Sequence, residues 1–381
     1  MKIMLSAGEA SGDLNASFLA RELKGLKPEV ELLGMGGAQM AAEGVDILAD
    51  PTQESVLGFV EVLRSLPKMR WLLRQLEAAL AKERPDCLVL VDFPGFNMKL
   101  AQRAHALRIP VVYYFAPSAW VWGGGRAKKV ARYCQLVLSV FPKEAEVYRE
   151  AGAHVASVGH PLVEIVQAKD CSLQQLGLED APFVALLPGS RPSEINNLLP
   201  QILSAAKLVH SERPDLQFVI ALSSSIPSSH IQEQVAQLPF PIKIITGATY
   251  ELLAKAEVAV IASGTATLEA ALLGTPMVIV YRVGMLTGFL ARFLIKTPYF
   301  GLPNILAGEE LVPELLQSQV QGERIAQELL KFLEKDQRQL RQKLLALGQK
   351  LGNSGAPRRA AEEIIGLLEG GKNTAHSHYS Q

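Results

Sequence analysis

The sequence predicts an α/β protein made of two Rossmann-like, doubly wound domains that face one cleft. Short apolar runs alternate with longer runs of helical periodicity, which is the pattern of βαβ units with parallel sheets. A length of 381 residues suits two domains of ordinary size. Hydrophobic residues make up 49% of the chain and charged residues 20%, so both domains have enough apolar surface for a packed core.

Apolar runs of strand length recur through both halves. In the first half they are Ile3–Ser6, Glu31–Gly34, Cys87–Val91, Val111–Phe115 and Leu136–Val140. In the second half they are Val184–Leu187, Phe218–Ala221, Lys243–Ile245, Val258–Ile261 and Met277–Tyr281. Ligands of such sheets bind at the carboxyl ends of the strands, so the loops that follow these runs are the candidates for a site.

A polar connector after Pro161 separates the two halves. We expect an N-terminal domain over residues 1–165 and a C-terminal domain over 166–350. A helix over 351–369 is expected to return to, or pack near, the first domain. The small polar tail 370–381 is expected to be disordered.

Charge and cysteine content narrow the class of protein. Lys+Arg and Asp+Glu both number 38, and a balanced charge argues against general nucleic-acid binding. Cys87, Cys134 and Cys171 are widely spaced, which fits a reducing compartment. The N-terminus lacks the apolar segment of a signal peptide, and no apolar run reaches about 18 residues. We therefore expect a cytoplasmic protein without a membrane-spanning helix.

Small hydroxyl residues and a glycine follow the strand Val258–Ile261 and open a helix. Ser263, Gly264 and Thr265 lie where backbone N–H groups and the helix dipole favour a phosphate. Glu269 shares a helix face with Thr265, and its carboxylate suits two ribose hydroxyls. The pattern indicates a nucleotide diphosphate site, and the alternative is an ordinary turn capped by Ser263 or Thr265.

Arg191 lies after the strand Val184–Leu187, where a second helix begins. Its forked donors suit a phosphate beside the backbone N–H groups of the helix. The alternative is a structural pair with Glu194.

Asp92 follows the apolar strand Cys87–Val91, and the sharp turn at Pro94-Gly95 should project its side chain into the cleft. A carboxylate beside two aromatic residues has a raised proton affinity, which suits a general base. The alternative is a turn-forming aspartate. Asn97 either orients a substrate or caps the following helix.

The first glycine-containing loop, Ser6–Asp13, is only a loose match to a dinucleotide fingerprint. Glu9 and Asp13 at the helix entrance do not suit a pyrophosphate, and Gly34–Gly37 replaces the expected ribose-binding acid. We therefore expect no nicotinamide or flavin cofactor. Asp13 is interpreted as an N-cap, and Glu9 either has a structural role or binds sugar hydroxyls.

The loop after Val111–Phe115 carries Trp120 and Trp122, which either stack on a sugar or pack in the core. Arg126 follows, as a cation for an anionic substrate or as part of a solvated helix start. His160 is interpreted as a hinge or packing residue. No histidine cluster or Asp-x-Asp pair predicts a metal site.

Two segments are more apolar than a single core-facing stripe requires, Val56–Leu76 and Gly284–Ala291. Basic residues lie in or beside both of them: Arg64, Lys68, Arg70, Arg74, Arg282, Arg292 and Lys296. This combination suits an anionic membrane surface. The alternative is core helices whose basic residues extend outward to water.

Six segments in a fixed order resemble bacterial lipid-A-disaccharide synthases. They are Ala7–Asp13, Asp92–Asn97, Pro117–Trp122, Leu187–Arg191, Ser263–Glu269 and Leu302–Gly308. The resemblance runs from Met1 to about Leu368.

The resemblance implies an inverting, metal-independent GT-B glycosyltransferase on the cytoplasmic face of the inner membrane. It implies the joining of UDP-2,3-diacylglucosamine to 2,3-diacylglucosamine 1-phosphate (lipid X), which gives a β-1,6-linked lipid A disaccharide 1-phosphate and UDP. Residues 1–165 would bind the acceptor and the membrane, and residues 166–350 the UDP-sugar. Exposed apolar helices add the expectation of a homodimer.

The resemblance also implies roles for single residues. Asp92 matches the residue proposed to deprotonate the acceptor 6-hydroxyl. Arg191 and Asn304 match positions that are essential or nearly so in the family. Glu269 matches the acidic residue that binds the nucleotide ribose, and Glu9 matches a functional acidic position.

This chain departs from the family pattern at Ala116, where serine is frequent, and at Gly123–Gly125, where bulkier residues are usual. These departures concern acceptor binding. The nearest alternative enzyme is a UDP-N-acetylglucosamine 2-epimerase of the same fold, which needs no surface for acyl chains. A non-catalytic solute-binding protein is a third interpretation, disfavoured because such proteins are commonly exported.

Overall fold

The computed structural model describes residues 1–51, 59–117, 119, 125–167, 171–223, 226–282 and 298–375. Several residues named above lie outside these ranges: Val56, Trp120, Trp122, the segment Gly284–Ala291, Arg292 and Lys296. The chain divides into two compact units. The first unit contains Met1–Pro161 and the residues from Leu351 onward, and the second contains the described residues between Leu162 and Lys350.

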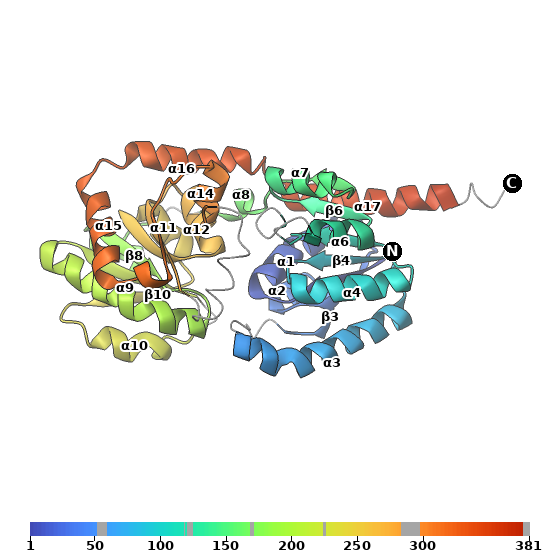
Figure 1. The fold of residues 1–381 in the computed structure, drawn as a ribbon, viewed down its shortest axis with the longest axis horizontal. Helices are drawn as coiled ribbons and strands as arrows, with labels where there is room; N and C mark the ends of the chain where they lie inside the picture. The colour runs from blue at the N-terminus through green and yellow to red at the C-terminus, as the bar shows by residue number, and fades with distance from the viewer. Residues whose placement is uncertain are drawn as a thin grey trace. The chain divides into compact units, whose positions relative to one another are not determined.

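The first unit contains a seven-stranded parallel sheet with the order β3-β2-β1-β4-β5-β6-β7 (Figure 1). Its strands are β1 (Lys2–Ala7), β2 (Glu31–Met35), β3 (Asp46–Ala49), β4 (Cys87–Val91), β5 (Val111–Tyr114), β6 (Leu136–Ser139) and β7 (Val155–Ser157). Every residue of β4 is buried, as expected of a central strand covered on both faces.

Helices cover both faces of this sheet. They are α1 (Ala10–Leu26), α2 (Ala38–Ala42), α3 (Phe59–Glu83), α4 (Pro94–Ala106), α6 (Gly125–Tyr133), α7 (Pro142–Glu150) and α17 (Ala356–Ala375). Apolar residues of α1 and α17 share one core cluster with the sheet, and those of α3, α4 and α6 share the cluster of the opposite face.

The helix α17 reaches Ala375, whereas we expected a disordered tail from residue 370. Once a helix is nucleated, each added residue gains a backbone hydrogen bond, so a polar composition alone does not end it.

The second unit contains a six-stranded parallel sheet with the order β10-β9-β8-β11-β12-β13. Its strands are β8 (Phe183–Leu187), β9 (Gln217–Leu222), β10 (Ile242–Thr246), β11 (Val258–Ala262), β12 (Met277–Tyr281) and β13 (Glu314–Leu316). Its helices are α8 (Leu162–Ile165), α9 (Pro192–Glu212), α10 (Ser229–Ala236), α11 (Thr249–Lys255), α12 (Thr265–Leu272), α14 (Leu302–Ala307), α15 (Gly322–Glu334) and α16 (Arg338–Lys350).

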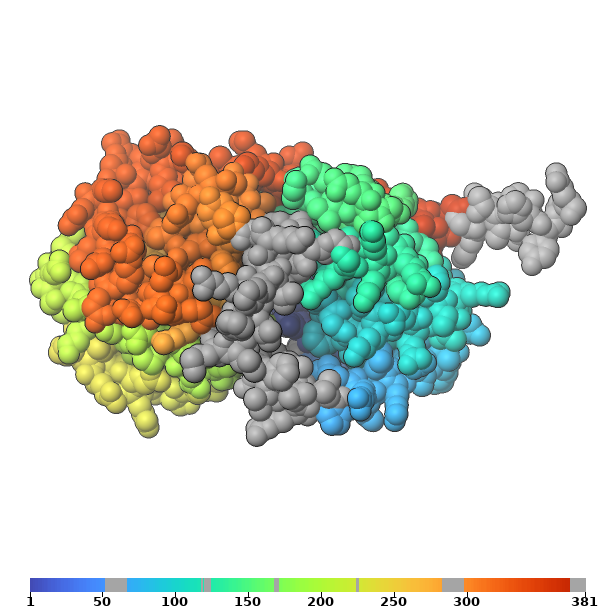
Figure 2. Space-filling model, viewed as in Figure 1, coloured from blue at the N-terminus to red at the C-terminus, as the bar shows by residue number. Residues whose placement is uncertain are grey.

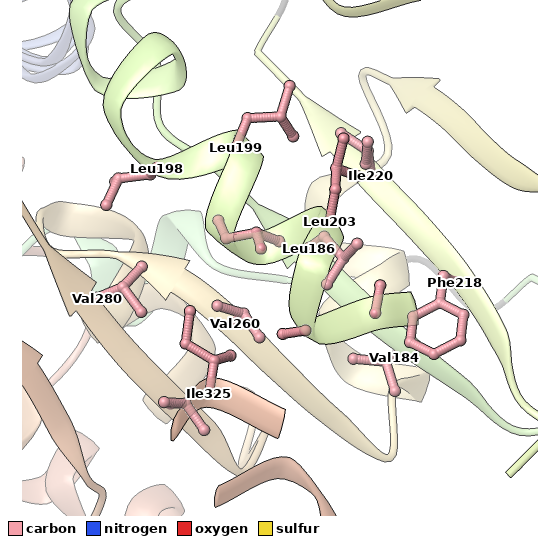
Figure 3. Packing of buried hydrophobic residues seen from close by; sticks show 14 of the residues in the cluster. Val184, Leu186, Leu198, Leu199, Leu203, Phe218, Ile220, Val260, Val280 and Ile325 are labelled. Carbon is pink, nitrogen blue, oxygen red and sulfur yellow. The ribbon is translucent and has the colours of Figure 1, made fainter. Parts of the chain in front are cut away.

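The long helix α9 supplies much of the core on one face of the second sheet. Its residues Leu198, Leu199 and Leu203 lie over strand residues such as Val184 and Leu186 (Figure 3). Leu199 is fully buried, and its truncation to alanine would cost about 2–5 kcal/mol of folding free energy. These contacts hold α9 against the sheet that contains β8.

The fold class is confirmed: both units are doubly wound, with all-parallel sheets. Each predicted strand is present, and its ends lie within one residue of the prediction. Three strands were not predicted, β3, β7 and β13, which have three or four residues each and lie at sheet edges.

Strand order reverses between β1 and β4 in the first sheet and between β8 and β11 in the second. Ligands of doubly wound sheets bind at the carboxyl ends of strands at such a reversal. The loops after these four strands carry most of the predicted site residues.

Candidate functional site

Asp92 occupies the loop between β4 and α4 with an unusual backbone. Its φ is 51°, and Phe93, the next residue, has a φ of 48°. Two successive non-glycine residues in the left-handed region cost about 1–3 kcal/mol each, and such a conformation persists only where neighbouring groups hold it. The Asp92 side chain is partly exposed, and Pro94 starts α4 directly after the turn.

Asn97 holds this turn from inside the protein. Its side chain is fully buried, and its Nδ2 donates to the carbonyl oxygen of Asp92 at 2.7 Å. The same Nδ2 lies 3.2 Å from the Ser6 carbonyl oxygen, and the Ser6 hydroxyl donates to Oδ1 at 2.7 Å. Asn97 therefore ties the ends of β1 and β4 together. The N-cap of α4 is Phe93, so the capping interpretation of Asn97 was wrong.

Gly8 and Glu9 form the loop after β1. A Cβ atom on Gly8 would clash with Cδ1 of Phe93, so the Phe93 ring covers Gly8 directly. Glu9 is the N-cap of α1 and is partly exposed, and its carbonyl oxygen accepts the N–H of Asp13 at 2.8 Å.

Asp13 caps a different helix from the one we expected. It is buried in the first turn of α1, and its carboxylate accepts the N–H groups of Gly37 at 2.8 Å, Gln39 at 3.0 Å and Met40 at 3.1 Å. These amides belong to the N-terminus of α2, so the N-cap role predicted for its own helix was wrong. The sequence shows a carboxylate near a helix start but not which helix start it reaches.

Arg126 lies on the exposed face of α6 with Lys128 and Lys129. The buried residues of this helix are Ala127 and Val130, so its cations face solvent. The two loop tryptophans that precede it lie outside the described residues.

Arg191 is the N-cap residue of α9 and pairs with Glu194. Its Nη1 lies 3.1 Å from Glu194 Oε1, and their side chains are 25% and 20% exposed. Glu194 Oε2 also accepts the N–H of Ser190 at 3.1 Å. The structural pair that we considered as the alternative is therefore formed, and it leaves the guanidinium partly accessible.

Tyr281, at the end of β12, was not predicted as a site residue. Burial raises the pKa of its phenol, Glu194 raises it further, and Arg191 lowers it. These effects place the phenol within electrostatic range of the Arg191–Glu194 pair. The feature of the sequence that could have indicated this residue is a tyrosine at the carboxyl end of a predicted strand.

The loop between β11 and α12 presents a helix N-terminus. Gly264 is the N-cap, Gly264 and Thr265 are exposed, and Ser263 is partly exposed. The N–H of Ser263 donates to Val280 on β12 at 2.9 Å, and the buried Thr267 hydroxyl donates to the Gly264 carbonyl at 2.7 Å. These contacts fix the loop, while the first N–H groups of α12 have no acceptor within their own helix.

Glu269 lies one turn further along α12 and is partly buried. Burial raises the pKa of its carboxyl group to about 7. Burial and the nearby Glu269 charge also raise the pKa of Tyr250 on α11, a second tyrosine that we did not predict. A carboxylate in this setting gains from hydrogen-bond donors supplied by a ligand.

Asn304 is fully buried in α14 and makes four hydrogen bonds to the segment that leads into β13. Its Nδ2 donates to the Val312 carbonyl and to Glu314 Oε1, both at 2.8 Å. Its Oδ1 accepts the N–H groups of Leu311 at 2.8 Å and Val312 at 3.1 Å. The Asn304 amide therefore organises a loop.

His160 is buried against Phe115 and Phe141, with ring centroids 5.3 and 5.1 Å away. Burial lowers its pKa to about 3, which keeps the imidazole neutral. The packing interpretation of His160 is confirmed. Within the described ranges, no group of three His, Cys, Asp or Glu side chains could hold a metal ion.

The described fold is similar to those of several solved structures. A putative UDP-N-acetylglucosamine 2-epimerase from Listeria monocytogenes has a TM-score of 0.68 at 13% identity, covering 97% of this chain and 96% of the other. The S. aureus MnaA–UDP structure has a TM-score of 0.68 at 14% identity, covering 97% of both chains. Together with the two parallel sheets, these similarities define the fold as GT-B.

The family follows from the sequence comparisons. The family model described as lipid-A-disaccharide synthetase matches residues 3–364. The synthase of Myxococcus xanthus is 40% identical over 377 residues, covering 97% of this chain and 98% of the relative. The synthase of Syntrophus aciditrophicus is 38% identical, covering 96% and 98%. The chain belongs to the lipid-A-disaccharide synthase family, whose members are hexosyltransferases, and the resemblance that its motifs predicted is confirmed.

Proposed function

We propose that the protein condenses UDP-2,3-diacylglucosamine with 2,3-diacylglucosamine 1-phosphate. The products are a β-1,6-linked lipid A disaccharide 1-phosphate and UDP. Family membership over nearly the whole chain supports the reaction class. The observation that carries the mechanism is the partly exposed Asp92, held in a left-handed turn at the strand reversal of the first unit.

Asp92 is the general base of this proposal. Its carboxylate takes the proton of the acceptor 6-hydroxyl while that oxygen bonds to the anomeric carbon of the donor. The bond from the anomeric carbon to the diphosphate breaks at the opposite face, which inverts the configuration. General-base assistance of this kind is worth about 10²–10⁴-fold in rate.

The second unit stabilises the departing UDP. Arg191 supplies a full positive charge at the start of α9, and the N–H groups from Gly264 onward supply the donors of the α12 N-terminus. Glu269 accepts two ribose hydroxyls, and Ser263 and Thr265 add hydroxyl donors. Fixed donors aimed at a developing negative charge lower the barrier without reorganisation during the reaction.

The remaining predicted residues have supporting roles. Glu9 binds sugar hydroxyls at the N-terminus of α1. Arg126 attracts the acceptor phosphate from the exposed face of α6. Asn97 and Asn304 act through the loops that they hold, because both side chains are fully buried. We expect no cofactor and no requirement for a divalent metal.

The described helices of the first unit offer a surface suited to anionic lipid. Trp71 on α3 is 59% exposed, and the exposed cations near it along α3 are Lys68, Arg70 and Arg74. Leu73, also on α3, lines a surface hollow together with Lys99 and Arg103 of α4. Figure 2 shows parts of α3 and α4 exposed next to each other on this unit. An aromatic residue among cations fits peripheral attachment to an anionic bilayer, which we propose is the inner face of the inner membrane.

Among the described residues, no helix combines the length and low polarity that crossing a bilayer requires. A homodimer remains a prediction, which sedimentation in detergent would test.

One assay tests the proposed reaction. The purified protein is incubated in mixed micelles with both diacylated substrates and EDTA, and the products are resolved by mass spectrometry. Formation of the disaccharide with one UDP per linkage supports the proposal, and NMR of the new linkage must show the β configuration. A parallel incubation with UDP-N-acetylglucosamine that yields its 2-epimer, with no disaccharide formed in the first, would establish the epimerase alternative instead.

A further inference from the structure

Tyr113 is a buried tyrosine whose hydroxyl reaches the turn that carries Asp92. It lies on β5, opposite Leu90 of β4, and it is fully buried. Its hydroxyl donates to the carbonyl oxygen of Asp92 at 3.0 Å. Burial raises the pKa of this phenol well above its usual range, so the hydroxyl keeps its proton and remains a donor.

The accepting carbonyl belongs to the peptide between Asp92 and Phe93, both of which are left-handed. Rotation of this one peptide plane would change ψ of Asp92 and φ of Phe93 together, and would let Phe93 relax to an ordinary conformation. The rotation would also turn the Asp92 carbonyl away from its donors. Hydrogen bonds to that carbonyl therefore oppose this rotation and help to hold the strained turn.

Asn97 is not dedicated to the Asp92 carbonyl. Its Nδ2 lies within hydrogen-bond distance of three carbonyl oxygens, those of Asp92, Val91 and Ser6, at 2.7, 3.2 and 3.2 Å. An amide has only two hydrogens to share among them. The Tyr113 hydroxyl donates its one hydrogen to Asp92, and it does so from a different strand.

We propose that Tyr113 is a positioning residue for the transfer reaction, which fixes the peptide after Asp92 and thereby aims the Asp92 carboxylate. The inference rests on the proposed role of Asp92 as the base. It adds a residue that no motif of the sequence indicated, since alternation along β5 predicts which face Tyr113 occupies but not its partner.

Tyr113→Phe removes only the hydroxyl and keeps the ring. We expect kcat to fall about 10- to 100-fold, with KM for both substrates and the Kd for UDP within about twofold of wild type. UDP binding reports only on the second unit, so urea unfolding monitored by circular dichroism checks that the first unit, which contains Tyr113, is folded. Tyr114→Phe is the matched control, since Tyr114 is the next residue of β5 and its ring belongs to the core cluster of the other sheet face.

A double-mutant cycle with Asp92→Asn separates positioning from a general structural role. If Tyr113 acts through Asp92, then Tyr113→Phe has no further effect on the rate of the Asp92→Asn variant. An equal fold-loss in both backgrounds would overturn the inference, as would a Tyr113→Phe variant with wild-type kcat. A fully active Asp92→Asn variant would instead refute the proposed base, and with it this role.

A second variant covers the case in which Tyr113→Phe does not fold. Incorporation of 3-fluorotyrosine at position 113 keeps both the ring and the hydroxyl donor. We expect at least half of the wild-type kcat from this variant. A loss as large as ten-fold, with the urea unfolding of the protein unchanged, would contradict a role that requires only the hydrogen bond.

Discussion

The guanidinium of Arg191 and the carboxylate of Glu194 form an ion pair across the first turn of α9, with 3.1 Å between Nη1 and Oε1. Glu194 in turn packs on Gly189, whose φ of 123° and lack of a side chain leave room for it. The pair orients the arginine without enclosing it. A nucleotide diphosphate would then meet a cation that is already in place.

Arg191→Ala should weaken UDP binding about 10- to 100-fold, because a hydrogen bond to a charged group contributes about 1.5–3 kcal/mol. Arg191→Lys should recover only part of this loss, since lysine keeps the charge but not the forked donors. Isothermal titration with UDP measures both effects. Unchanged UDP affinity in the alanine variant would limit Arg191 to its pairing with Glu194.

Asp92→Asn should lower kcat by about 10²–10⁴-fold, because the amide cannot take a proton. The Kd for UDP should stay unchanged, because residue 92 lies in the first unit and the proposed UDP site lies in the second. Initial rates in mixed micelles and UDP titration check the two halves of this prediction. A parallel loss of UDP affinity would assign Asp92 to the nucleotide instead.

Glu269→Gln should stabilise the protein at alkaline pH. The pKa of Glu269 is raised from its ordinary 4.5 to about 7, so the folded state binds this proton more tightly than the unfolded state does. The resulting stability is fully present below pH 4.5 and is lost as the pH rises through 7. We expect the variant to gain about 1–3 kcal/mol over wild type at pH 8 and little at pH 5, measured by urea unfolding.

The same substitution should weaken UDP binding, and the Kd of wild type should fall relative to that of the variant between pH 6 and pH 8. The UDP phosphates ionise in the same way in both experiments. Their effect on Kd therefore cancels when the wild type and the variant are compared. If the Kd for UDP has the same pH dependence in both proteins, Glu269 does not bind the ribose through its carboxylate.

Asn304→Ala should destabilise the second unit by about 2–4 kcal/mol, because it leaves the buried N–H and carbonyl groups of Val312 without the partner that Asn304 now provides. Asn304→Asp should be no better, since it places a second carboxylate beside Glu314. Urea unfolding of both variants checks this expectation. Wild-type stability combined with lost UDP affinity would instead indicate direct contact with the ligand.

Trp71→Ser should weaken binding to vesicles that contain anionic phospholipid, and the binding should fall with added salt. Leu345→Ser is the control, because Leu345 is similarly exposed, 50% against 59%, but lies on α16 of the second unit. Co-sedimentation with vesicles measures the difference. Equal effects of the two substitutions would count against the first unit as the membrane-facing one.

The strands that the sequence predicted are those with an uninterrupted apolar run. β4 and β12 were predicted with their observed bounds, Cys87–Val91 and Met277–Tyr281, because central parallel strands are covered on both faces. The three missed strands lie at sheet edges. Each is short and partly exposed, as in Asp46–Ala49, so neither an apolar run nor an alternation marks it.

The loops that carry the candidate site residues were predicted from the sequence, but most of the hydrogen-bond partners of these residues were not. A strand followed by a glycine and a hydroxyl residue identified the α12 N-terminus, because that pattern is local in the sequence. The contacts of Asp13 with α2, and of Asn97 with the end of β1, join residues far apart in the chain. No local pattern contains them, and the same holds for Tyr113 and Asp92.

The first unit is completed by a helix that is translated after the whole of the second unit. Residues such as Ala360 and Ile364 of α17 fill the core beside Leu19 of α1, and Glu369 pairs with Lys27 at 2.8 Å. During translation, the first unit is therefore the first to emerge from the ribosome but the last to complete its core. Until then the apolar side of α1 is exposed to water and can bind other apolar surfaces. A nascent chain that stops before Ala356 therefore has an N-terminal unit with an incomplete core, even if its second unit has folded.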